Sequence, residues 1–199
     1  MNKLLLATTN QGKLREYHRL FVDLPLELVA PGDIGSTLEV EEDASTFAEN
    51  ARLKAVAFAA ESGLAALADD SGLEVDALDG EPGTRSARYA GDDAGDADRI
   101  AFLLERMTDV PWEKRTARFC CVIAFARPDG AVRYCSGECR GKIASEPRGE
   151  HGFGYDPVFF LPELGRTMAE LSPEEKDRIS HRGEAAREAH DLLTKEFAV

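Results

Sequence analysis

The sequence contains no long hydrophobic run, no internal repeat and no linker rich in proline, glycine and serine. A membrane-spanning helix needs about 18 or more consecutive apolar residues, so we expect no transmembrane segment. The chain starts directly with a short strand-like stretch and shows no cleavage-type signal, so we expect a cytoplasmic rather than a secreted protein. Because no linker divides the 199 residues, we expect a single domain with room for two lobes.

Cysteine is scarce, and its four positions are Cys120, Cys121, Cys135 and Cys139. Adjacent residues of a strand point to opposite faces, which argues against one zinc site built from all four thiols. A chain of this length without a secretion signal does not favour a disulfide framework either. We therefore expect reduced, mostly buried thiols on neighbouring strands.

Basic residues are outnumbered, because 24 Lys and Arg face 37 Asp and Glu, for a formal net charge of -13. This balance argues against a broad nucleic-acid-binding surface, which would need clustered positive charge. A polyanionic ligand would need a local group of cations, or a metal ion held by some of the many carboxylates.

Strand-like and helix-like stretches alternate along the chain, which predicts an α/β fold. Strands are expected at 3–8, 26–30, 65–69, 116–127, 131–138 and 157–161, and helices at about 12–22, 45–62, 96–107 and from 172 onward. Ser45 is expected to cap the second helix, and the Asp-Gly pair at 129–130 to form a hairpin turn. Ser172 and Glu175 have the spacing of a capping box, and Gly183 is expected to break the C-terminal helical region.

A small polar turn follows the first predicted strand and leads into a helix. It consists of Thr8, Thr9, Asn10, Gln11, Gly12 and Lys13. The start of a helix presents backbone N–H groups and the positive end of the helix dipole, and both favour phosphate. The glycine permits close approach, Thr8 and Asn10 supply hydrogen bonds, and Lys13 supplies charge. The phosphate-loop pattern GxxxxGKS/T is absent, and a capped helix with a surface lysine explains this stretch equally well.

Two adjacent carboxylates, Asp69 and Asp70, follow a small apolar strand and precede Ser71. Their burial is costly unless water, a cation or hydrogen bonds meet them. Ligands of α/β proteins are expected at the carboxyl ends of strands, and Mg²⁺ prefers oxygen ligands, few of them from the protein. We therefore favour a metal-binding role over an acidic surface turn, and the acidic stretch 39–43 offers a partner carboxylate.

A glycine-rich loop at 149–157 carries Phe153, Tyr155 and Asp156. Its glycines do not fit the dinucleotide-binding pattern GxGxxG. The two aromatic side chains could stack on a planar ring, and the aspartate could accept from the ring edge or hold the loop. A loop whose aromatic residues cap the core is the alternative, and this stretch alone does not decide between the two.

The C-terminal region supplies a fourth candidate site, in which Lys176 and Ser180 lie one helical turn apart and therefore share a face. His181 and Arg182 follow directly. Cations beside an ordered helix could bind phosphate or an oxygen-rich ring. A solvated, charged helix is the alternative interpretation for any one of these charges.

Together the four candidate sites suit a nucleoside triphosphate, with phosphates at the polar turn, a metal ion at the carboxylates and a planar base at the aromatic loop. The sequence also resembles the inosine triphosphate pyrophosphatase family, the house-cleaning enzymes for non-standard purine nucleotides. The matching blocks are "TTNQGK" at 8–13, "TFAENARLKA" at 46–55, "ADDSGLEVDALDGEPGTRSARYAG" at 68–91, "GFGYDPVF" at 152–159 and "AELSPEEKDRISHRG" at 169–183. They run in order over nearly the whole chain, so together they are highly specific.

The resemblance implies a long mixed β-sheet flanked by helices, with two lobes around a central active-site cleft. It implies a homodimer that needs Mg²⁺ and cleaves ITP, dITP or XTP to the monophosphate and pyrophosphate, which keeps these bases out of DNA and RNA. Glu42 and Asp70 correspond to the metal ligands, with Asp69 in support, and Asp70 to the proton acceptor for the attacking water. Glu42 is chosen over Glu41 by its spacing to the block at 46–55. The substrate-binding residues that the resemblance implies are Thr8, Thr9, Asn10, Gln11, Gly12, Lys13, Ser71, Phe153, Gly154, Tyr155, Asp156, Lys176, His181 and Arg182.

Base choice and three alternatives follow from the same residues. Hypoxanthine and xanthine carry O6, which could accept from Arg182 or from backbone N–H groups, whereas the amino group of adenine would set donor against donor.

Septum-inhibitor-like nucleotide pyrophosphatases act on other bases, and the blocks at 152–159 and 176–183 argue against them. A regulatory nucleotide-binding module, or an acidic α/β domain with an unrelated small ligand, would show no metal-dependent turnover.

Overall fold

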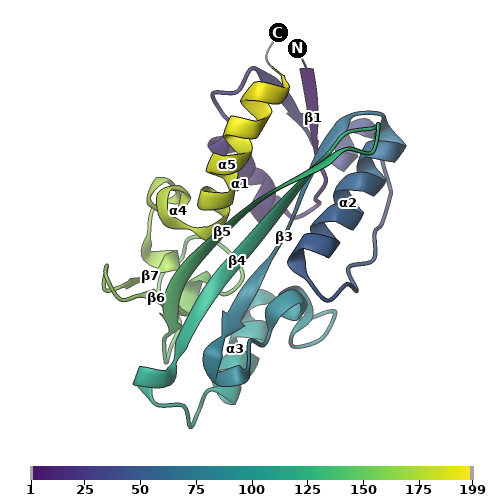
Figure 1. The fold of residues 1–199 in the computed structure, drawn as a ribbon. Helices are drawn as coiled ribbons and strands as arrows, with labels where there is room; N and C mark the ends of the chain where they lie inside the picture. The colour runs from purple at the N-terminus through teal and green to yellow at the C-terminus, as the bar shows by residue number, and fades with distance from the viewer. Residues whose placement is uncertain (1, 198–199) are drawn as a thin grey trace. The chain divides into compact units, whose positions relative to one another are not determined.

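Seven strands form one sheet in the order β2-β1-β3-β4-β5-β6-β7 in the computed structural model, which describes residues 2–197 (Figure 1). The strands are β1 (Asn2–Leu6), β2 (Leu26–Val29), β3 (Ala65–Val75), β4 (Thr116–Ala126), β5 (Val132–Ile143), β6 (Phe159–Leu161) and β7 (Arg166–Thr167). β1 runs parallel to β2 and β3, whereas β6 runs antiparallel to β5 and β7, which confirms the expected mixed sheet. Among the helices of the described range, none has the length and apolar character needed to cross a membrane.

The helices are α1 (Gln11–Leu20), α2 (Phe47–Ser62), α3 (Asp96–Arg106), α4 (Pro173–Ile179) and α5 (His181–Glu196). The chain divides into two compact units. The first unit consists of the residues up to Asp70, Cys121–Gly137 and the residues from Arg182 onward, and the second of Ser71–Cys120 and Glu138–His181. These units correspond to the two expected lobes, whereas their assembly into a single domain with a cleft stays a prediction.

In the first unit, residues of β1 and β3 alternate between the two faces of the sheet. Leu6 and Leu67 pack on one face with Tyr17 and other residues of α1 and α5. Ala66 and Ala68 pack on the opposite face with the alanine-rich buried side of α2. Figure 1 shows α2 on the other side of these strands from α1 and α5. Consecutive residues of β3 therefore meet different helices, as the two-residue period of a strand requires.

The core of the second unit forms around the other half of β3 and the second half of the chain. Leu73 packs with Leu103 of α3, and the rings of Phe119 and Phe159 lie with their centroids 4.3 Å apart. Tyr155, from the glycine-rich loop, belongs to the same cluster and is only 4% exposed. The loop is therefore anchored on this core by one of its two aromatic residues.

The expected end of the third strand at residue 69 is wrong, because β3 continues to Val75. Asp69, Asp70 and Ser71 lie inside the strand and not in a loop at its carboxyl end. Buried strands are usually apolar, so two consecutive aspartates in a sequence indicate the end of a strand. They fit inside a buried strand only when other residues neutralise or hydrogen-bond them. β5 likewise continues to Ile143, five residues beyond the predicted end at 138.

Two predicted details of the helices are also wrong. Thr46, not Ser45, caps α2, and its Oγ1 accepts from the N–H of Glu49 at 3.2 Å. The C-terminal helical region breaks at Ser180, whose extended backbone separates α4 from α5, while Gly183 lies within α5. Such boundaries depend on local backbone conformation, which composition specifies only to within a few residues.

The predicted hairpin, capping box and cysteine environment are confirmed. The N–H of Arg127 donates to the carbonyl of Ala131 at 2.9 Å across the turn, where Gly130 has a φ of 89°. The Oγ of Ser172 accepts from the N–H of Glu175 at 3.2 Å at the start of α4. All four thiols lie on β4 and β5, which are neighbours in the sheet, and three of them are buried.

Candidate functional site

The predicted polar turn connects β1 to α1 and is held by its own side chains. The Oδ1 of Asn10 caps α1 by accepting from the N–H of Lys13 at 3.1 Å. The Oγ1 of Thr8 accepts from the N–H of Asn10 at 3.2 Å. Thr9 and Gln11 are exposed. The expected strand–turn–helix is therefore confirmed, while phosphate binding at its N–H groups stays a prediction.

Lys13 points from this turn toward Asp69 of β3. Its Nζ lies 3.1 Å from Oδ1 of that carboxylate and donates to the backbone carbonyl of the same residue at 3.2 Å. The side chain of Lys13 is only 14% exposed. The interpretation of a freely solvated surface lysine therefore does not describe this residue.

The backbone carbonyl of Asp69 accepts from a second lysine, Lys54 of α2, at 2.8 Å. β1 ends at Leu6, and the N–H of Ala7 makes a last bond to the carbonyl of Leu67 at 2.8 Å, whereas β3 runs on. The carbonyl of Asp69 therefore lies just beyond the part of β3 that β1 covers. A buried carbonyl needs a donor, and here two ammonium groups meet the same oxygen.

The carboxylate of Asp69 is fully buried and lies between cations. Arg182 donates to its Oδ2 at 2.9 Å, and the same guanidinium donates to Glu16 of α1 at 2.8 Å. Burial acts to raise the pKa of Asp69, but Lys13 and Arg182 outweigh it and hold that pKa well below its ordinary value. Asp69 is therefore charged at neutral pH and organises the lysine and the arginine around it.

Asp70 lies on the opposite face of β3, on the side of α2. Its Oδ2 accepts from the side-chain amide of Asn50 at 2.9 Å. Burial raises the pKa of Asp70 above its ordinary value, and the nearby carboxylate of Glu42 raises it further, although Lys54 and Asn50 act against both. Asp70 is thus a desolvated carboxylate whose charge an additional cation would stabilise.

Glu42, from the acidic stretch 39–43, lies near Asp70 and Lys54. Its Oε2 lies 2.8 Å from Nζ of Lys54, and its side chain is 40% exposed. Lys54 therefore connects the carboxylate of Glu42 with the backbone of Asp69. The choice of Glu42 over Glu41 as a metal ligand stays a prediction.

The second unit brings together Phe153, Asp156 and Lys176, all from the predicted substrate-binding set. The Nζ of Lys176 lies 2.5 Å from Oδ2 of Asp156 and 4.8 Å from the ring centroid of Phe153. The same Oδ2 accepts from the N–H of Phe153 at 2.8 Å. The lysine is 4% exposed. The phenylalanine is half-buried and is the ring of this loop that stays accessible for stacking.

Two further residues predicted to bind substrate are packed in the second unit. Tyr155 is buried, and its hydroxyl donates to the carbonyl of Ser86 at 2.9 Å. Its environment is the one expected of an aromatic residue that caps the core. His181 stacks on Phe119 with ring centroids 4.7 Å apart. Ser71 continues β3 directly after Asp70 and is partly exposed.

The chain matches the model of the Ham1 family over residues 4–192. It belongs to the Ham1 family. A protein of Desulforamulus reducens named dITP/XTP pyrophosphatase is 50% identical to it over 193 residues, 97% of this chain and 96% of that protein. A Geobacillus kaustophilus protein of the same name is 52% identical over 185 residues, 93% of this chain and 91% of that one. The solved structure of a HAM1 protein from Coxiella burnetii is 45% identical in sequence to this chain and superposes on it with a TM-score of 0.89. The match covers 98% of this chain and 100% of that one.

Membership of the Ham1 family confirms the resemblance inferred from the five sequence blocks. Three buried partners of the site carry no role in that inference: Asn50, Lys54 and Glu16. Asn50 and Lys54 are four residues apart on the buried side of α2, among apolar residues. A polar residue on an apolar helix face is unusual unless it has a partner, and this signal was available in the sequence. Glu16 gave no such signal, because its partner lies 166 positions away.

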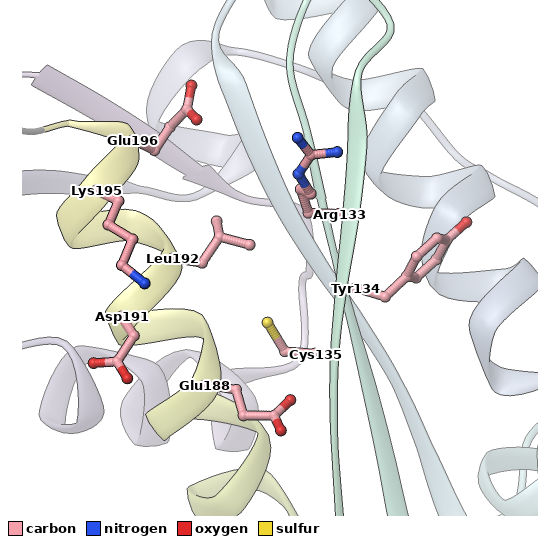
Figure 2. Close-up of a pocket in the computed structure, with 8 residues that line it drawn as sticks. All are labelled: Arg133, Tyr134, Cys135, Glu188, Asp191, Leu192, Lys195 and Glu196. Atoms are coloured by element: carbon pink, nitrogen blue, oxygen red, sulfur yellow. The ribbon is translucent and has the colours of Figure 1, made fainter.

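A groove of about 490 Å³ lies elsewhere in the first unit of this Ham1 protein, along β5 and α5 (Figure 2). Its lining includes Arg133, Cys135, Glu188, Leu192 and Lys195. Figure 2 shows the thiol between the strand and the helix. None of the predicted site residues lines this groove, so it adds nothing to the nucleotide site.

Proposed function

We propose that this protein hydrolyses ITP, dITP and XTP to the nucleoside monophosphate and pyrophosphate and so removes non-standard purine nucleotides from the pool. The names of its relatives support this reaction, since both cited proteins are called dITP/XTP pyrophosphatase. The observation that carries the proposal is the pair Asp69 and Asp70. The carboxylate of Asp69 pairs with Lys13 and Arg182, whereas that of Asp70 accepts from the amide of Asn50 and would be stabilised by an added cation.

The phosphates bind, in this proposal, at the polar turn from Thr8 to Lys13. The N-terminus of α1 supplies backbone donors there, and Lys13 supplies charge. Lys54 adds a second ammonium group, since both lysines donate to the carbonyl of Asp69. Neutralising the charge that develops on the phosphate oxygens is the main contribution of an enzyme to phosphoryl transfer.

The proposed cofactor is Mg²⁺, held by Glu42 and Asp70. No group of three or more His, Cys, Asp and Glu side chains suited to a metal occurs within residues 2–197. Mg²⁺ needs only one or two carboxylates when substrate phosphates and water complete its shell, so the pair fits. The two carboxylates repel each other, and a bound cation would relieve that repulsion. Asp69 supports the site through its ion pairs and not as a ligand.

Asp70 is the proposed proton acceptor. The attacking water gives a proton to its carboxylate and forms a bond to the α-phosphorus, while the bond to the departing pyrophosphate breaks. Asn50 holds the carboxylate in place during this step by donating to Oδ2. When bound, Mg²⁺ would stabilise the negative charge on the phosphate oxygens. A positioned general base contributes about a hundred- to ten-thousandfold to such a rate.

The base is recognised, in this proposal, by the loop of the second unit. Phe153 offers the stacking surface, while Asp156 and Lys176 keep the loop in shape. Arg182 is engaged by Glu16 and Asp69, and the N–H groups of Phe153 and Gly154 donate to Asp156 and Asp96, so a donor to O6 would have to exchange one of these partners for the base. Ser71 and His181 stay predicted to contact the substrate. The homodimer and the cytoplasmic location also stay predictions.

The test is pyrophosphate release from ITP, dITP, XTP, ATP and GTP, with Mg²⁺ and with a chelator, in the wild type and in Asp70→Asn. We expect fast, metal-dependent release from the first three nucleotides and a loss of about a hundredfold or more in the variant. Glu74→Gln is the matched control, because Glu74 also lies on β3 and pairs with Arg118. Binding of ITP without turnover in the wild type would favour a regulatory nucleotide-binding module instead.

A further inference from the structure

We infer that Asp96, the first residue of α3, is a positioning residue for base recognition, because it ties Gly154 of the aromatic loop to that helix. The inference rests on the proposed function, which uses this loop for the base. The Oδ2 of Asp96 accepts from the N–H of Gly154 at 2.7 Å. The two residues lie 58 positions apart, and Asp96 lies outside the five blocks that carry the family resemblance.

The carboxylate of Asp96 is itself fixed in place. Its Oδ1 forms an ion pair with Arg99, one helical turn later. The guanidinium of Arg99 also donates to the carbonyls of Ala87 at 2.6 Å and Ala94 at 2.8 Å. The acceptor for Gly154 is therefore held by a small network, although the side chain of Asp96 is 46% exposed. An acceptor held in this way can define the position of a loop.

Each residue of the stretch 153–155 is tied by a different contact. The N–H of Phe153 donates to Asp156 within the loop, and the hydroxyl of Tyr155 donates to Ser86. Gly154 has no side chain and has a φ of 63°, so its own conformation is weakly restricted. The bond to Asp96 therefore supplies a restraint that the glycine cannot supply, directly beside the ring proposed to stack on the base.

The expected consequence of losing this bond is weaker substrate binding with little change in the chemical step. Phe153 belongs to the binding part of the proposed site, whereas Asp70 and Lys13 belong to the first unit and have no contact with Asp96 among those described. An interaction that holds the substrate equally before and during the reaction affects KM and not kcat. We therefore expect a substitution of Asp96 to change KM, by an amount that depends on the base of the substrate.

The experiment compares Asp96→Ala, Asp96→Asn and Asp98→Ala. Asp98 is the matched control, because its Oδ2 caps the same helix through the N–H of Gly95 at 3.0 Å and does not contact the loop. We expect Asp96→Ala to raise KM for ITP roughly five- to tenfold at nearly constant kcat. Asp96→Asn keeps one acceptor oxygen for Gly154 but loses the ion pair with Arg99, so its KM should lie between those of the wild type and Asp96→Ala. Asp98→Ala should lower the melting temperature without changing KM.

Amide hydrogen exchange at Gly154 provides a readout that does not depend on turnover. Exchange there should be faster in Asp96→Ala and unchanged in Asp98→Ala. Equal KM in the wild type and Asp96→Ala, or equal effects of the two alanine variants on KM, would overturn the inference. If the wild type itself releases no pyrophosphate, the proposed function fails, and unchanged exchange at Gly154 would then show that the restraint fails as well.

Discussion

The two faces of β3 in the first unit give consecutive aspartates opposite environments. Asp69 faces α1 and α5, where Lys13 and Arg182 surround its carboxylate and lower its pKa. Asp70 faces α2, where burial raises its pKa in spite of the opposing effects of Lys54 and of its amide partner Asn50. Because both residues are aspartates, the opposite shifts of their pKa values come from the side chains that pack against each face of β3.

Two neighbouring residues of β3 are therefore expected to serve different purposes, one in stabilising the fold and the other in the proposed catalysis. A carboxylate that is already neutralised by two cations has little to offer a metal ion, but its loss leaves buried charges behind. A carboxylate that is buried without full compensation is costly by itself and gains most from a cation that arrives with the substrate. In the proposed reaction Asp69 therefore maintains the structure of the site, and Asp70 takes part in the chemistry.

The largest expected effect on stability follows from Asp69→Asn. Lys13 would lose the carboxylate beside it and Arg182 would keep only Glu16 as a counter-charge, so we expect a loss of about 3–5 kcal/mol in the free energy of unfolding. Urea unfolding followed by circular dichroism measures this value. Asp70→Asn is the matched control on the same strand, and we expect its change to stay below about 1 kcal/mol, since it removes a charge that burial disfavours.

Comparable losses in the two variants would contradict the separation drawn above. The result would mean that Asn50 and Lys54 stabilise the charge of Asp70 as strongly as the cations stabilise that of Asp69. Greater loss in Asp70→Asn would reverse the assignment of the two roles altogether.

A smaller effect is expected from Glu16→Gln, which removes charge from the far end of the same network. Glu16 is 4% exposed and binds the guanidinium of Arg182 at 2.8 Å. A glutamine keeps a hydrogen-bond acceptor, so we expect a loss of about 1–3 kcal/mol. Glu27→Gln is the control, because the pair of Glu27 with Lys3 is nearly half exposed on both sides and should not change the urea midpoint. Equal midpoints in both variants would show that the buried network adds nothing.

The sequence was sufficient to predict most helices and strands and the hairpin, because these depend on periodicity and on local turn chemistry. The family and the mixed sheet were predicted from the resemblance that the five sequence blocks carry. It placed Asp69 and Asp70 after a strand, where they would share one site. The structure places them inside β3, and the partners that explain this include Arg182, which is 113 positions away from Asp69. Ion pairs over such distances leave no local pattern, so the division of labour between the two aspartates required the structure.

The smallest expected effect is a difference in pH dependence, measured on both aspartate variants by urea unfolding in the presence of a chelator. The pKa of Asp69 is lowered on folding, so its stabilisation is present above its ordinary pKa of about 4 and is lost as pH falls through the folded value. The pKa of Asp70 is raised, so its contribution is present below about pH 4 and is lost as pH rises through the folded value. Relative to the wild type, Asp69→Asn should therefore become less destabilised below about pH 4, whereas Asp70→Asn should become relatively more stable as the pH rises above about 4. Differences of the same sign would show that both faces of β3 treat their carboxylates alike.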